Sequence, residues 1–127
     1  MKLILLDSSA WIAMAHDGPN AKMFARAMAE AEQVLVSAIS IYEIARYTTR
    51  VAGDAATEKL LSFVSLHQIV PISAEIATLA ADLGARHQLA MADALIYATS
   101  AVHQAELWTQ DADFKELPNV KCFLAPA

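Results

Sequence analysis

Short apolar runs, unbroken by charge, recur along the chain and are separated by longer stretches with helical periodicity. The first run, Leu3–Leu6, ends abruptly at Asp7. A run without polar alternation is typical of a parallel strand that is covered on both faces. We therefore predict a buried first strand there, and further strands at residues 34–36, 68–71, 107–109 and 120–123.

Between these runs, apolar residues recur at helical spacing and predict amphipathic helices. Serine and aspartate mark their expected starts, and glycine marks their expected ends. The expected helices run from Ser8 or Ser9 to just before Gly18, over 20–30, from Ser37 or Ser40 to just before Gly53, over 55–66 with Asp54 as N-cap, from Ser73 to an end loosened by Gly84, and over 91–104.

Alternating strands and helices predict a five-stranded parallel sheet with helices on both faces, a three-layer α/β sandwich. The chain has no internal repeat, linker or low-complexity tract, so we expect a single domain over residues 1–127. In such a sheet, residues just after strands and residues early in the following helices can share one crevice at the carboxyl edge.

Composition narrows the possible functions. Nine Lys and Arg against fourteen Asp and Glu give a net charge of −5, which argues against broad non-specific binding of nucleic acid, because that binding depends on neutralised phosphates. The 57% hydrophobic content favours an apolar contact face and hence a homodimer. Cys122 is the only cysteine, so we expect a reducing, cytoplasmic location. No apolar stretch has the length of a membrane span.

Five acids fall on the expected crevice. Asp7 follows the first strand, and Asp111 and Asp113 follow the fourth. Glu43 and Asp93 lie in the early turns of two helices. Each acid also has an ordinary structural explanation: the aspartates could cap helices and turns or complement a helix dipole, and Glu43 could complete a capping box with the serine three residues before it.

Convergence of these acids favours a bound cation. Several carboxylates in one low-dielectric crevice repel one another unless some take up protons or share a metal ion. Mg²⁺ or Mn²⁺ fits an all-oxygen site that uses carboxylates and substrate phosphates. Such a site favours phosphodiester hydrolysis, because the metal neutralises phosphoryl charge and lowers the pKa of a bound water. The four scattered histidines give no zinc spacing, and no serine-hydrolase or glycine-rich nucleotide motif is present.

Four ordered motifs carry a family resemblance: Leu5–Ser9, Ser40–Glu43, Met91–Thr99 and Thr109–Phe114. Together they resemble the acidic motifs of PIN-domain ribonucleases, specifically the bacterial VapC toxins. The resemblance spans nearly the whole chain. It implies a PIN-like sheet of strand order 3-2-1-4-5 and an Mg²⁺- or Mn²⁺-dependent endoribonuclease toxin. It also implies an RNA substrate, with tRNA among the candidates, a cognate antitoxin partner and a homodimer.

By residue, the resemblance assigns Asp7, Glu43, Asp93 and Asp111 to the family's catalytic and metal-binding acids. Asp113 stays open as an alternative to, or a companion of, Asp111. Asp7 and Asp93 are the expected principal metal anchors. Glu43 is expected to bind metal or to orient the attacking water.

Other polar residues are expected to support this site. Ser8 and Thr109 match hydroxyls that orient carboxylates or metal-bound waters in the family. Arg46, Arg50 and Arg86 are candidates for contacts with RNA phosphates. The alternative for Arg46 is a solvated helix face on which it pairs with the acid three residues before it.

Three other functions compete with the nuclease. A PIN module could bind metal or RNA without turnover. A receiver-type signalling domain has a similar size and an acidic Mg²⁺ pocket, but it should carry adjacent acids after its first strand, where this chain has Ser8 and Ser9 after Asp7. A dehalogenase-type phosphatase should carry a second aspartate at the position of Ser9.

Overall fold

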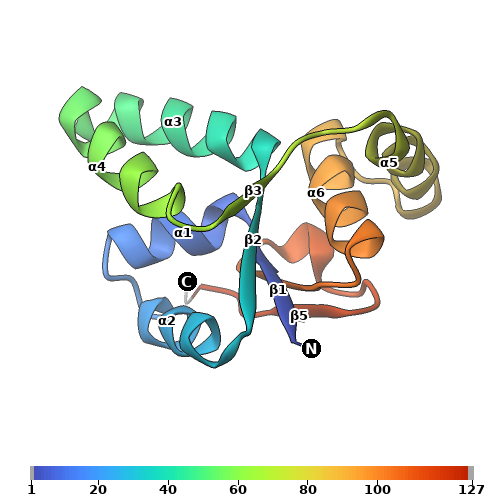
Figure 1. Ribbon diagram of the computed structural model, residues 1–127, viewed down its shortest axis with the longest axis horizontal. Helices are drawn as coiled ribbons and strands as arrows, with labels where there is room; N and C mark the ends of the chain where they lie inside the picture. Colours follow the sequence, from blue (N-terminus) through green and yellow to red (C-terminus); the bar gives the residue numbers. More distant parts are fainter. Residues whose placement is uncertain (1, 126–127) are drawn as a thin grey trace.

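The strands and helices lie close to the positions that the sequence predicts. The computed structural model describes residues 2–125. Its elements, labelled in Figure 1, are β1 (Leu3–Leu6), α1 (Ser8–Ala15), α2 (Ala21–Glu30), β2 (Gln33–Ser37), α3 (Ala38–Ala52), α4 (Asp54–Val64), β3 (Gln68–Val70), α5 (Ala74–His87), α6 (Met91–Val102), β4 (Glu106–Thr109), the short 3₁₀ helix η1 (Ala112–Phe114) and β5 (Val120–Cys122).

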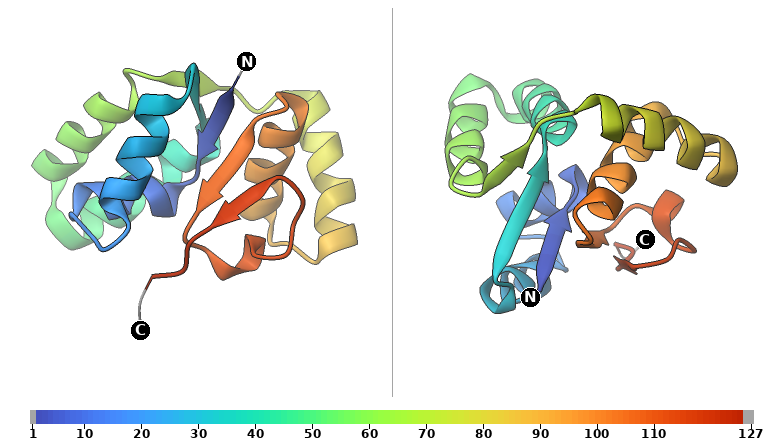
Figure 2. Two further views of the ribbon diagram at one scale, coloured as in Figure 1. Left: turned by 90° about the horizontal axis from the view of Figure 1, so that it is seen from below. Right: turned by 45° about the vertical axis from the view of Figure 1, so that its right-hand side comes forward.

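All five strands are parallel and follow the order β3-β2-β1-β4-β5. This confirms the predicted α/β class and the strand order 3-2-1-4-5. The central strand is β1, where Leu5 pairs with Leu35 of β2 on one side and with Leu107 of β4 on the other. The N-terminal strand therefore lies beside a strand from the far end of the chain, as the left view of Figure 2 shows.

The two faces of the sheet bury separate hydrophobic clusters. Ile4 and Leu6 point into the cluster beneath α1, α2 and α4, whereas Leu5 points into the cluster beneath α5 and α6. Figure 1 shows these two groups of helices on opposite sides of the strands. The three layers explain why the strand sequences lack polar alternation. Among residues 2–125, none of the helices combines the length and the hydrophobicity that crossing a bilayer requires.

Two helix starts differ from the prediction. Asp7 caps α1, because its carboxylate accepts a hydrogen bond from the backbone N–H of Ala10, so the expectation of Ser8 or Ser9 as cap is wrong. The N-cap of α4 is Gly53 at a φ of +90°, a conformation that glycine adopts without a Cβ clash. Asp54 is instead the first residue of α4, where its charge complements the helix dipole.

One further expectation is wrong for a reason of packing, and one alternative that the sequence left open does not occur. Gly84 does not loosen α5, which continues to His87. A Cβ at residue 84 would lie 3.2 Å from the Cβ of Ala94, so the glycine permits the close approach of α5 and α6. The capping box of Ser40 with Glu43 does not form, because Ser37 caps α3 and the Ser40 hydroxyl is buried without a partner in the described residues.

Candidate metal centre

The deepest acid of the crevice is Asp7, at the carboxyl end of β1. Leu6 is in register with Trp108, so the next residues, Asp7 and Thr109, lie side by side where β1 and β4 end. The Asp7 side chain is only 3% exposed. The Thr109 hydroxyl donates to its Oδ2 at 2.7 Å, and the Ser9 hydroxyl donates to its Oδ1 at 2.7 Å. With the N–H of Ala10 also bound to Oδ1, both carboxylate oxygens have protein partners.

The same two hydroxyls fix the loop after β4. The Thr109 hydroxyl oxygen accepts the backbone N–H of Asp111 at 2.9 Å, and the Ser9 hydroxyl oxygen accepts that of Gln110 at 3.0 Å. Asp111 in turn accepts the N–H of Asp113 through Oδ1 at 2.9 Å and so caps η1. One hydrogen-bonded network therefore joins residues about a hundred positions apart in sequence and orients the acids of both segments.

Glu43 reaches the crevice from the second turn of α3. Its Oε1 accepts a hydrogen bond from the hydroxyl of Ser8, the first residue of α1. This contact fixes the glutamate next to Asp7 and gives Ser8 the orienting position that the sequence predicts. The glutamate is therefore bonded across to α1 and makes no capping-box contact with Ser40 in the described residues.

Asp93 lies in the first turn of α6, as predicted, and faces the loop after β4. One carboxylate oxygen from each of Asp93, Asp111 and Asp113 lies within 4.8 Å of the other two. Asp111 is half-buried and Asp113 is exposed. The structure thus places both candidates for the fourth acid beside Asp93, rather than one to the exclusion of the other.

Burial and mutual repulsion raise the pKa of two of these acids. Burial raises the pKa of Asp7 to about 6, despite hydrogen bonds from two hydroxyls and a backbone N–H that lower it. Burial, followed by the negative charges of its neighbours with Asp111 first, raises the pKa of Asp93 to about 7. Near neutral pH these acids therefore resist simultaneous ionisation, and a cation between them would relieve that resistance.

The donor set fits a hard divalent cation. Six oxygens around one Mg²⁺ at its usual bond length lie about 3 to 4.2 Å apart, and the three-acid spacing of up to 4.8 Å is only slightly wider. Asp7 and Glu43 line the same cavity as Asp93 and Asp111, so further oxygens are close by. All candidate ligands are carboxylates, which suits Mg²⁺ or Mn²⁺ and not a soft or nitrogen-preferring metal.

The acids open into a cavity of about 750 Å³. Arg46 and Arg50 line its α3 side, whereas Arg86 lies outside it on α5, paired with Asp82 at 2.8 Å. Arg46 makes no ion pair with Glu43, since Arg86 with Asp82 is the one ion pair found among residues 2–125. The first two arginines therefore lie beside the acids, and the third does not.

Sequence reasoning missed the part played by Ser9. Its hydroxyl bonds both the buried carboxylate of Asp7 and the loop after β4, whereas the sequence indicated only a helix cap. A hydroxyl two residues after an acid at the end of a buried strand is a usable signal, because such a side chain can turn back to that acid. Tyr42 and Tyr47 of α3, which also line the cavity, were missed as well.

Comparison with known proteins agrees with this fold. The PIN domain family model matches residues 4–120, so the chain belongs to the PIN-domain family. The resemblance to its VapC branch is confirmed by the solved structures that the fold matches. No protein in the curated set matches the chain.

Three of the matching structures illustrate this likeness. A toxin–antitoxin complex from Klebsiella pneumoniae has a TM-score of 0.81 and 26% identity over 93% of this chain and 95% of the matched chain. FitAcB from Neisseria gonorrhoeae has a TM-score of 0.72 and 25% identity, covering 94% and 96%. VapC20 from Mycobacterium tuberculosis, described as a sarcin-ricin loop cleaving toxin, has a TM-score of 0.77 and 20% identity, covering 91% and 95%.

Proposed function

We propose that this chain is a divalent-metal-dependent endoribonuclease and the toxin of a toxin–antitoxin pair. The observation that carries the proposal is the meeting of Asp7, Glu43, Asp93 and Asp111 in one cavity, in a chain of the PIN-domain family. These four acids come from two helices and two strand ends. A metal-assisted phosphodiesterase uses them together.

In this proposal Asp93, Asp111 and Asp113 hold Mg²⁺ or Mn²⁺ together with Asp7, the second principal anchor that the sequence predicts. The ion would neutralise phosphoryl charge and lower the pKa of a bound water. Glu43 accepts a hydrogen bond from Ser8 through Oε1, which leaves Oε2 to orient the attacking water. Thr109 holds Asp7 and the start of the loop that carries Asp111.

The partners follow from family and from charge. Several matching structures are toxin–antitoxin complexes, and some of these are bound to DNA, which supports a cognate antitoxin for this chain. Arg46 and Arg50 are the phosphate contacts that we propose for an RNA strand; tRNA is one candidate substrate. We further propose a homodimer of single domains spanning residues 1–127, acting in the cytoplasm.

The receiver-type alternative conflicts with the topology. Receiver domains have the strand order 2-1-3-4-5, whereas this sheet has the order β3-β2-β1-β4-β5. The residues also conflict with a phosphatase of the dehalogenase type. Ser9 occupies the position of its second acid and donates a hydrogen bond to Asp7. The remaining alternative, a PIN module that binds RNA without turnover, is separated from the nuclease by the following test.

The test is cleavage of end-labelled RNA by the purified chain with Mn²⁺, with Mg²⁺ and with EDTA. We expect internal cleavage with either metal, and none with EDTA or with the Asp93→Asn variant. Induced expression should arrest bacterial growth, and the same variant should not. Binding of RNA without cleavage in either metal, by a folded wild-type chain, would establish the non-catalytic module instead.

A further inference from the structure

One face of α3 lines the acidic cavity with aromatic and basic side chains. Tyr42, Arg46 and Arg50 follow one another at intervals of four residues, so they form one row along the helix. Tyr47 lies beside this row, and all four side chains line the cavity that also holds Glu43. The row therefore starts next to the proposed metal site and runs away from it along α3.

The two arginines in this row are available to a phosphate. Within residues 2–125 neither has a carboxylate within ion-pair distance, although four acids line the same cavity. The guanidinium of Arg50 lies over the ring of Tyr47 at 5.6 Å from its centroid. The Tyr47 ring also meets His16 edge-on, at 6.3 Å between centroids. Tyr47 thus already contacts two other side chains, and its ring positions Arg50.

Tyr42 differs from Tyr47 in having a free ring. Its side chain is 58% exposed, and in the described part of the chain no other aromatic ring or guanidinium packs against it. A large flat side chain held open beside a charged cavity is the arrangement by which proteins stack an unpaired nucleobase, while nearby cations follow the phosphates.

We infer that Tyr42 stacks on a base of single-stranded RNA, next to the phosphodiester bond that is cleaved. Tyr42 directly precedes Glu43, so the base belongs to a nucleotide adjacent to the acids. Arg46 and Arg50 contact the phosphates that follow along α3. Bases inside a duplex are stacked on one another and offer no free face, so the strand must be unpaired at this nucleotide. This inference rests on the proposed function and adds to it a residue that contacts the substrate base.

The experiment measures binding apart from cleavage. An RNA of about 12 nucleotides, carrying a 2-aminopurine near its centre, is titrated with the full-length protein in EDTA, and its integrity is checked on a gel. We expect the 2-aminopurine emission to fall on binding to wild type and to Tyr42→Phe, which keeps an aromatic face. For Tyr42→Leu we expect no fall and a 5- to 100-fold weaker binding, about the loss found for one stacked base. The same RNA annealed to its complement should bind weakly and without this change.

A matched control is Val51→Ala on the same helix. Val51 is 50% exposed and does not line the cavity, so this change should leave both readouts as in wild type. Equal affinity and equal emission for wild type and Tyr42→Leu would overturn the inference, as would failure of wild type to bind the single strand. A fall in emission without any cleavage in Mn²⁺ would support stacking while removing the nuclease proposal. Equal cleavage and equal binding by wild type and Tyr42→Leu would support the nuclease proposal and remove the stacking inference.

Discussion

The floor and the rim of the cavity hold their negative charges in different ways. The floor is Asp7 with Ser9 and Thr109, and there both carboxylate oxygens are hydrogen-bonded by the protein. The rim is Asp93, Asp111 and Asp113, where three carboxylates approach one another. Among residues 2–125 no hydrogen bond reaches the carboxylate of Asp93, and burial, followed by the neighbouring negative charges, raises its pKa.

This difference separates what the fold supplies from what a ligand must supply. The floor has all its hydrogen bonds without an ion, because two hydroxyls and a backbone N–H bind both oxygens of Asp7, although burial still raises the pKa of this acid to about 6. The rim is complete only when a cation or protons neutralise it. We therefore expect substitutions on the floor to weaken metal binding by altering the positions of the acids. We expect substitutions on the rim to act by changing the negative charge that the cation neutralises.

The largest effect should come from removing a rim charge. Asp93→Asn keeps the shape of the side chain but removes a metal ligand. Mutating a residue that only supports the ligands lowers metal affinity or activity about 10- to 100-fold, and losing a ligand itself should lower them more. RNA cleavage should fall at least about 100-fold. The metal-free variant should have a higher Tm than wild type at about pH 8, because a half-buried, repelled charge is gone.

The matched control for that change is Asp82→Asn. Asp82 is an exposed helical aspartate that pairs with Arg86 outside the cavity, so cleavage should stay at the wild-type rate. Undiminished cleavage by folded Asp93→Asn would remove Asp93 from the metal site. An unchanged or lower Tm of the metal-free variant at about pH 8 would contradict the charge account of the rim.

The next largest effect should come from the floor. Thr109→Val keeps the shape but removes the donor to Asp7 and the acceptor for the N–H of Asp111. Mn²⁺ affinity, measured by calorimetry, should fall about 10- to 100-fold. Unfolding should become easier by about 1 to 3 kcal/mol, because a buried carboxylate loses a partner. Thr109→Ser should restore both the Mn²⁺ affinity and the stability. Equal values of these two quantities in the Val and Ser variants would contradict the role given to the Thr109 hydroxyl.

A smaller effect concerns pH, and its sign changes with the metal. The pKa values of Asp7 and Asp93 are raised to about 6 and about 7, so the protons they bind favour the metal-free fold at low pH. That stabilisation should be lost as pH rises through about 6 to 7. Metal binding must displace these protons, so Mn²⁺ affinity should fall about 10-fold between about pH 8 and about pH 6.

Thermal unfolding and calorimetry at several pH values check both halves of this prediction. Metal-free protein should have a lower Tm at about pH 8 than at about pH 5.5, and saturating Mn²⁺ should remove or reverse that trend. Metal affinity that is flat across the range would show that the rim acids are already ionised without a cation.

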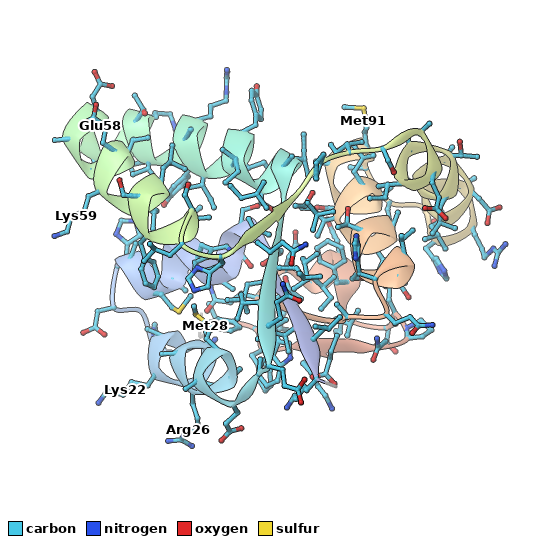
Figure 3. The ribbon with its side chains drawn as sticks, viewed as in Figure 1. Lys22, Arg26, Met28, Glu58, Lys59 and Met91 are labelled. Carbon is cyan, nitrogen blue, oxygen red and sulfur yellow. The ribbon has the colours of Figure 1, made fainter. Side chains whose placement is uncertain are left out.

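The smallest effect should come from the cationic side of the cavity. Arg46→Gln should weaken RNA binding, and the slope of log affinity against log salt should shrink by about 1, because one phosphate contact is lost. The control is Arg26→Gln on α2, whose side chain points to solvent on the side of the molecule away from α3 (Figure 3). Equal slopes of log RNA affinity against log salt in the two variants would show that Arg46 does not contact an RNA phosphate.

Sequence patterns predicted the strand ends and the acids that follow them better than the hydroxyl contacts of the floor. Buried strands and the acids that follow them are local features, and parallel topology alone brings their ends to one edge. The resemblance to PIN domains added the strand order, which places β1 beside β4. The family assignment and the strand order are thus both visible in short motifs such as Leu5–Ser9 and Thr109–Phe114.

What the sequence hides is pairing across long separations. The contacts of Thr109 with Asp7, and of Ser8 with Glu43, depend on strand register and helix rotation. For this reason the sequence predicts Ser9 as a helix cap, whereas in the structure Asp7 is the cap and Ser9 donates a hydrogen bond to it. The tight packing at Gly84 was hidden as well, because the helix that it meets follows in sequence only after a turn.

The adjacency of β1 and β4 has a consequence during translation. A nascent chain that has emerged only as far as residue 105 contains Asp7, Glu43 and Asp93, but it lacks the strand that carries Thr109 and the acids after it. Long-range strand pairing of this kind forms late and slowly. The acid cavity of the proposed nuclease is therefore incomplete until about the last sixth of the 127-residue chain has been synthesised.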